Sequence, residues 1–272
     1  LQHICLMHGM EVDYYKKLFQ TIGNIIELIE KDDIPKYLLF LENVFPYMDN
    51  YNYQKGMKAI IQELKNFLKR KDIGTDSDRA LLLDFQATLE IKPEKAIKLE
   101  KDALAQIENI TADNARLVSN LHANLGGLYR MNGHPDLARE HMEKSISLLD
   151  QFNLLHINDS IPQIANYAMF LTEQQEPERG ISELQKLSGI IKEYHSDDCL
   201  DYAKVQETLG TIYLMTANLP QAKTHFKRAF KIYEKIWADE PEMIEAKYQE
   251  IQELYPQIGF CIGKNLSGLL TK

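Results

Sequence analysis

The chain of 272 residues has few cysteines and no long apolar run. Its three cysteines, Cys5, Cys199 and Cys261, are too few and too scattered for a disulfide framework or a zinc site, which favours a reducing environment. No apolar run reaches the roughly 18 residues that a membrane-spanning helix needs. No basic-then-apolar segment of the kind found in secretion signals opens the chain either. We therefore expect a cytoplasmic location and no membrane partner.

Positive charge is also scarce. Lys and Arg total 31 against 40 Asp and Glu, which is a formal net charge of −9. Because non-specific nucleic-acid binding depends on basic residues that neutralise phosphates, this balance argues against direct contact with nucleic acid. A hydrophobic content of 44% is typical of a folded chain and excludes a disordered one. The first residue is Leu1 and not Met, so we interpret the sequence as a fragment of a longer protein.

What the chain does contain is an internal repeat of 42 residues. The segment 124–129 (NLGGLY) recurs in outline at 208–213 (TLGTIY), two periods later, and an alanine follows the glycine of each segment by twelve residues. A degenerate third copy is centred on Ala168, and a weaker first copy begins near Leu83. A proline precedes the second half of each copy, as is common in the first turn of a helix.

Each copy is predicted to form a hairpin of two helices, A and B. Glycine inside a helix costs roughly 1 kcal/mol relative to alanine, so its return at a fixed phase, at Gly126 and Gly210, indicates close packing between the two helices. The pattern resembles the tetratricopeptide repeat (TPR), in which a Leu-Gly-x-x-Tyr helix precedes an Ala…Phe…Ala helix. Its period exceeds the usual ~34 residues, as in repeats of the kinesin-light-chain type.

The resemblance implies an all-α fold, a right-handed superhelical solenoid of antiparallel helical hairpins. We predict an N-terminal helical linker or cap over residues 1–73, with helices at 11–31, 35–48 and 51–71. About four hairpins should occupy 74–238, and capping helices 239–272. Ile244, Ile251 and Tyr255 should cover the apolar face of the last hairpin, because a solenoid needs a cap.

No arrangement of residues in the sequence predicts catalysis. The glycine-containing segment 259–265 lacks the hydroxyl residue and the preceding strand of a phosphate-binding loop. His134 and His141 lack the spacing of a metal pair and are interpreted as a solvated helix face. We expect no enzymatic activity, no cofactor and no metal.

A binding surface is predicted on the concave side, which the A helices of a curved stack line. The residue before each Leu-Gly position in successive repeats is Leu82, Asn124, Asn166 and Thr208. An amide offers the donors and the acceptor that the backbone of an extended peptide requires. In kinesin-light-chain-like TPRs, asparagines at this position contact peptide backbone, so the resemblance implies that role here. The alternative is that both asparagines bond to neighbouring hairpins. The whole predicted surface comprises Phe85, Asn120, Asn124, Arg130, Met131, Asn166, Met169, Lys204, Glu207, Thr208 and Met215.

The predicted function is therefore a non-catalytic module that binds a protein or an extended peptide. Residues 1–47 also resemble the joint between a winged-helix module and TPRs in bacterial STAND-class (NB-ARC type) signalling NTPases, although no nucleotide-binding residue is included. That resemblance implies the sensor or regulatory arm of a larger protein. A free-standing scaffold, a peptide-pheromone receptor domain of a transcriptional regulator and self-association through the parent protein remain open alternatives.

Overall fold

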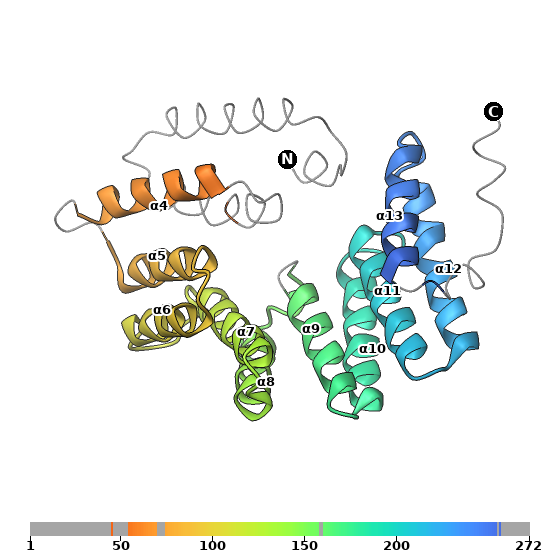
Figure 1. The fold of residues 1–272 in the computed structure, drawn as a ribbon, viewed down its shortest axis with the longest axis horizontal. Helices are drawn as coiled ribbons and strands as arrows, with labels where there is room; N and C mark the ends of the chain where they lie inside the picture. Colours follow the sequence, from red (N-terminus) through yellow and green to blue (C-terminus); the bar gives the residue numbers. More distant parts are fainter. Residues whose placement is uncertain (1–44, 46–53, 70–73, 158–159, 255, 257–272) are drawn as a thin grey trace. The chain divides into compact units, whose positions relative to one another are not determined.

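The computed structural model describes residues 45, 54–69, 74–157, 160–254 and 256, and these residues form helices joined by turns, with no strand among them. The predicted helices at 11–31 and 35–48 lie outside the described residues, except for Phe45. The predicted helix at 51–71 is present as α4. The helices are α4 (Gln54–Leu68), α5 (Asp76–Thr88), α6 (Pro93–Gln106), α7 (Ala115–Met131), α8 (Pro135–Gln151), α9 (Ser160–Glu173), α10 (Pro177–Tyr194), α11 (Leu200–Met215), α12 (Leu219–Ile236) and α13 (Pro241–Leu254) (Figure 1).

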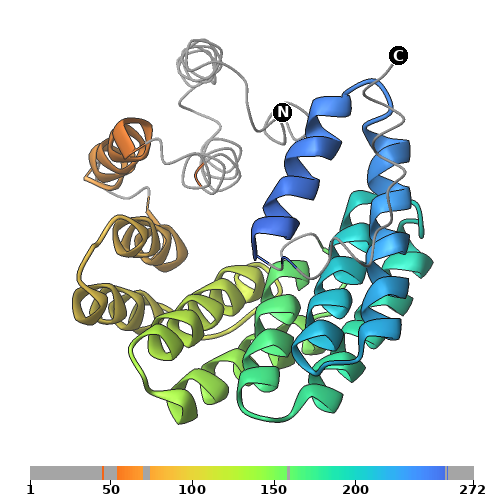
Figure 2. The same cartoon turned by 45° about the vertical axis from the view of Figure 1, so that its right-hand side comes forward.

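Helices α5 to α12 form four hairpins in chain order, which confirms the predicted all-α repeat. The hairpin partners α5 and α6, α9 and α10, and α11 and α12 pack along their lengths (Figure 1 and Figure 2). The chain divides into two compact units, Leu1–Ser145 and Ile146–Lys272, each of which is described by itself. The three sequence domains, 1–73, 74–238 and 239–272, stay a prediction.

The helix-start signals act as predicted. Pro93, Pro177 and Pro220 lie in the first turn of α6, α10 and α12, where a missing N–H costs no hydrogen bond. Helix α5 begins with a capping box: the Thr75 hydroxyl accepts from the Asp78 backbone N–H at 3.2 Å, and the Asp78 carboxylate accepts from the Thr75 backbone N–H at 2.6 Å.

The turn between helices A and B is also periodic. Gly133, Gln175 and Ala217 lie one period apart and have positive φ angles of 76°, 66° and 59°. In each turn the next residue donates its backbone N–H to a carbonyl five residues earlier, at 2.7 to 2.9 Å, as in a Schellman motif. Only one of the three turns uses glycine, the residue that adopts this conformation without strain.

Small residues lie at the A–B contact of three hairpins. An added Cβ on Gly126 would lie 2.6 Å from Met142 Cγ, and one on Gly210 would lie 2.9 Å from the Phe226 ring. In the hairpin of α9 and α10 the glycine is on the B helix instead, where a Cβ on Gly180 would lie 2.6 Å from the Ala168 carbonyl oxygen. The close approach predicted from the repeat is therefore present.

The core of the first unit includes one of the residues that the sequence predicts at the binding surface. Phe85 is 2% exposed and stacks on Phe45, with ring centroids 3.9 Å apart. It packs with apolar residues of α4, such as Met57 and Leu64. The prediction of Phe85 as a ligand contact is wrong, because α4 covers this side of α5.

The last described helix, α13, packs against α12. Ile244 and Ile251 of α13 are buried, as predicted, and Phe230 of α12 meets Tyr248 edge to face. Tyr255 lies outside the described residues.

Candidate binding surface

Apart from Phe85 of α5, the predicted residues of the first unit lie on α7, where the side chain of Asn124 already bonds to other residues. Its side-chain Nδ2 donates to Asp84 Oδ1 at 2.8 Å and, less favourably, to Glu100 Oε1 at 3.3 Å. Asn124 thus joins α7 to both helices of the preceding hairpin, as the alternative interpretation expected. Asn120 and Arg130 are half-buried and contact other residues, while Met131 is 83% exposed at the end of the helix.

Asp84 and Glu100, whose carboxyl groups accept hydrogen bonds from the Asn124 amide, lie at the contact between helices A and B of the first hairpin. Asp84 takes the repeat position of Gly126 and Gly210, and Glu100 takes the position of Met142 and Phe226. The first hairpin therefore has two acids where the other hairpins have a small residue against an apolar one. The repeat register contains this signal, because Asp84 and Glu100 lie one period before Gly126 and Met142.

Glu100 is a buried carboxyl group with an unusual protonation state. It is 2% exposed, and its Oε2 atom is buried without a hydrogen-bond partner among the described residues. Burial first, and then the Asp84 carboxylate, raise the pKa of Glu100 to about 10, against a smaller opposing effect of the Asn124 amide. Glu100 is therefore protonated at neutral pH.

In the second unit, the predicted residues lie on the neighbouring A helices α9 and α11. Asn166 of α9 is exposed, and no hydrogen bond of its amide to another described residue is found. Met169 on the same helix is half-buried. On α11, Lys204 is exposed and lies 3.8 Å from Asp201, a weak ion pair.

Two further predicted residues of α11, Thr208 and Glu207, already bond to other groups of this chain. The Thr208 hydroxyl donates to the Lys204 carbonyl oxygen at 3.0 Å within the helix. Glu207 accepts from the Tyr233 hydroxyl at 2.6 Å and from Lys247 Nζ at 3.0 Å, so both of its carboxylate oxygens are engaged. Glu207 thus links α11 to α12 and α13.

The electrostatics of this link follow from burial and charge. Burial and the Glu207 carboxylate raise the pKa of Tyr233 well above 10, so its hydroxyl stays a donor. Burial alone would lower the pKa of Lys247, but Glu207 and Glu250 outweigh it and raise that pKa. This ion pair is half-buried, so the loss of either partner would leave a charge that is only partly compensated, and Glu207 serves the fold.

A polar contact between helices A and B recurs in two hairpins. His122 Nδ1 lies 2.8 Å from His141 Nδ1, and His225 Nδ1 lies 2.9 Å from Gln206 Oε1 at the same repeat positions. The ring of His141 stacks on Tyr129, and burial lowers the pKa of both members of the histidine pair, that of His122 to about 4. The interpretation of His141 as part of a solvated face is wrong, because its side chain is half-buried against His122 and Tyr129.

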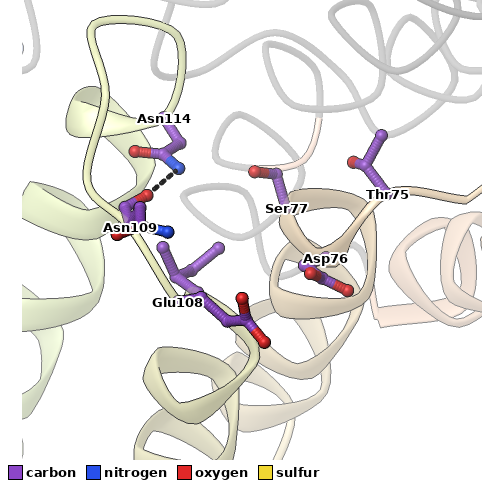
Figure 3. A pocket seen from close by; sticks show the side chains of 7 residues that line it. Thr75, Asp76, Ser77, Glu108, Asn109 and Asn114 are labelled. Atoms are coloured by element: carbon purple, nitrogen blue, oxygen red, sulfur yellow. Dashed lines mark hydrogen bonds between the residues drawn. The ribbon is translucent and has the colours of Figure 1, made fainter.

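An open depression lies where α5 begins. Figure 3 shows Thr75, Asp76 and Ser77 on one side of it and Glu108, Asn109 and Asn114 on the other. The Asn114 side chain donates to the Asn109 carbonyl oxygen at 3.0 Å, which orders the loop before α7 (Figure 3). The first-turn amide of Asp78 is already bonded to Thr75, so this depression offers little to an anion.

Neither a cluster of three or more metal-binding side chains nor a membrane-spanning helix occurs among the described residues. No group of three or more His, Cys, Asp or Glu side chains that could hold a metal ion is found in that part of the chain. No described helix is both long enough and apolar enough to cross a membrane.

Comparison with known proteins identifies the repeat. Residues 160–235 match the family model of the tetratricopeptide repeat. A comparison with curated protein sequences gave no significant match.

Solved structures show the same fold at low sequence identity. The nearly identical TPR-like repeats assigned to a kinesin light chain of Podosopora anserina share 12% identity, with a TM-score of 0.57 over 75% of this chain and 98% of that one. BtubC (BKLC) from P. vanneervenii shares 18%, with a TM-score of 0.55 over 66% and 72%. The apo form of RapI shares 15%, with a TM-score of 0.53 over 92% and 71%. Residues 160–235 therefore resemble the tetratricopeptide repeat in sequence, and the described helices have the fold of a TPR-like helical solenoid.

Proposed function

We propose that the chain is a non-catalytic module that binds an extended peptide or protein segment on the A helices α9 and α11. The tetratricopeptide repeat fold is consistent with protein binding, and proteins built from it are typically non-catalytic scaffolds. The observation that supports this surface most is Asn166, whose exposed amide is not committed to another described residue. An uncommitted amide retains both donors and its acceptor for a ligand backbone.

The neighbouring side chains suit an extended segment. Met169 and Met215 provide apolar contact on α9 and α11, and Met215 is 45% exposed. Lys204 keeps an exposed ammonium group whose ion pair with Asp201, at 3.8 Å, contributes little. Apolar contacts beside exposed amide and ammonium groups fit the main chain and side chains of a peptide better than a compact polar molecule.

Peptide display on the full chain tests this function. The strongest peptide selected from a random library would be labelled and titrated by fluorescence anisotropy against wild type, Asn166→Ala and Gln185→Ala. We expect Asn166→Ala to weaken binding by about 1–3 kcal/mol, because it leaves polar groups of the ligand unpaired. Gln185, an exposed residue of the B helix α10, is the matched control and should have no effect.

Three outcomes would contradict the proposal. The first is that no peptide is selected. The second is that Asn166→Ala binds the peptide as tightly as wild type does, and the third is that Gln185→Ala loses as much affinity as Asn166→Ala. Thermal melting of each variant ensures that a loss of affinity is not a loss of folding.

We further propose that this module is the sensor or regulatory arm of a larger signalling protein. The support is the resemblance within residues 1–47, which apart from Phe45 lie outside the described residues. The coding sequence upstream of Leu1 tests it. A nucleotide-binding motif there would support the regulatory arm, a helix-turn-helix would favour the peptide-pheromone receptor, and neither would favour a scaffold.

A further inference from the structure

His122 of α7 and His141 of α8 direct their imidazole rings at each other. The two Nδ1 atoms lie 2.8 Å apart and the ring centroids lie 5.1 Å apart, with the ring planes inclined by 34°. Sequence spacing does not reveal this pair, because the two residues are 19 positions apart and belong to different helices. The packing of α7 against α8 brings the two rings together.

A hydrogen bond between the two nitrogens requires two different tautomers. One ring carries its proton on Nδ1 and donates it, and the other ring has a bare Nδ1 that accepts. Burial lowers the pKa of both His122 and His141, so both rings are neutral at pH 7. A neutral imidazole is the form that ligates a metal ion.

The spacing of the rings matches that of two imidazoles on one zinc ion. With Zn–N distances of about 2.0–2.1 Å and a tetrahedral angle, the two bound nitrogens are roughly 3.3 Å apart and the ring centroids roughly 5.2 Å apart. The centroids of His122 and His141 already have this separation, at 5.1 Å. Each ring therefore needs only to turn in place, which moves the two nitrogens apart by about 0.5 Å.

The surroundings leave the pair accessible to an ion. Both histidines are half-buried, so part of each ring remains open to water, which completes the coordination of the ion. No group of three or more ligand side chains occurs in the described part of the chain, so the two rings are the whole protein ligand set. The charged groups that act on them are Glu140 and Lys144 of α8 and Lys101 of α6. All three are exposed and screened by solvent, so coordination by the rings must hold the ion.

We propose that His122 and His141 form a two-histidine site for Zn²⁺ between α7 and α8. Both Nδ1 atoms coordinate the ion, and water molecules fill its other positions. The ring that donated its Nδ1 proton releases that proton to solvent and takes up another on Nε2, so the number of bound protons does not change. The site is separate from the proposed peptide surface, which lies on α9 and α11.

The fourth hairpin contains a matched control. At the repeat positions of His122 and His141 it has Gln206 and His225, with Gln206 Oε1 2.9 Å from His225 Nδ1. A glutamine on helix A is therefore compatible with this contact. His122→Gln should remove one ligand and retain the hydrogen bond between the helices.

Zn²⁺ alone is the probe, and Mg²⁺ is a control ion of equal charge that prefers oxygen ligands. Both ions would be titrated into the full chain, isotope-labelled so that NMR follows the ring nitrogens of each histidine. We expect Zn²⁺ to shift the Nδ1 resonances of His122 and His141 together and saturably. Both rings should become the tautomer with its proton on Nε2. Mg²⁺ should change neither ring, and His225 in the same spectrum should respond only at higher Zn²⁺ concentrations.

His122→Gln should raise the half-saturating Zn²⁺ concentration at His141 at least about tenfold, because a single imidazole lacks its chelating partner. His134→Gln removes an exposed histidine of the same hairpin and should leave that concentration unchanged.

Unchanged tautomers in Zn²⁺, or a response of His141 equal to that of His225, would overturn the site and leave only a hydrogen bond between helices. A response that survives His122→Gln, or that His134→Gln removes equally, would overturn it as well. The comparison of His141 with His225 on wild type needs no variant, so the proposal stays testable even where His122→Gln lowers the stability of the fold.

Discussion

The ring of Phe226 on α12 lies so close to Gly210 on α11 that an added β-carbon would stand 2.9 Å from it. The same relationship joins Gly126 to Met142 in the second hairpin, at 2.6 Å from the added atom. The repeat thus preserves one steric contact, a glycine beneath a large apolar side chain. Four predictions follow from this contact and from the other features of the repeat.

Gly210→Ala should destabilise the protein by about 1–3 kcal/mol, because the new methyl group meets a fully buried ring. Gly127→Ala is the matched control, since a Cβ at that position meets nothing within 4 Å. The control should stabilise by up to about 1 kcal/mol through helix propensity. Urea unfolding followed by circular dichroism measures both, and equal effects of the two substitutions would contradict the packing argument.

Ala217→Gly should stabilise the protein by roughly 0.5–1 kcal/mol, because the residue has a φ of 59° that alanine adopts only with strain. Gly133→Ala, at the same position of the second hairpin, should have the opposite sign. Thermal melting of both variants is the measurement. Effects of the same sign in the two turns would show that φ does not govern these positions.

Glu100→Gln should remove a pH dependence of stability. The folded-state pKa of Glu100 is raised from 4.5 to about 10, so above pH 4.5 the unfolded chain loses a proton that the folded protein retains. The stability from this group is therefore complete below pH 4.5 and falls as the pH rises towards 10, by at most about 1.4 kcal/mol per unit.

Glutamine resembles the protonated acid and does not titrate, so the variant should be more stable than wild type at pH 8 and similar to it near pH 4. Unfolding in urea at several pH values measures this. Glu94→Gln, at an exposed residue in the first turn of α6, is the control and should leave the slope unchanged. Parallel pH profiles for wild type and Glu100→Gln would show that Glu100 is not the titrating group.

Deletion of residues 241–272 should promote self-association. Met243, Ile244 and Ile251 of α13 are buried, so the deletion exposes the apolar side chains of α12 that they cover. It also removes Lys247 from Glu207, which leaves a carboxylate without its cation. Light scattering of the truncated chain should report oligomers, whereas a monomer of unchanged melting temperature would place the cap elsewhere.

The sequence by itself determined the helical hairpins, their period and the buried residues of α13. These follow from residues that act locally: prolines in first turns, glycine at Gly126 and Gly210, and the apolar pattern of each helix. Their effects depend on neighbours within one hairpin, so a 42-residue period is enough to find them. The burial of Ile244 and Ile251 was predictable for the same reason.

Only the tertiary structure decided which polar side chains remain available to a ligand. Asn124 and Asn166 occupy the same repeat position, yet Asn124 is bonded to Asp84, 40 residues earlier, and Asn166 is exposed without such a bond. Glu207 is engaged by two helices that follow it in the chain. A side chain on one helix meets residues of the next hairpin through the packing between hairpins, and helical periodicity within one repeat does not encode that meeting.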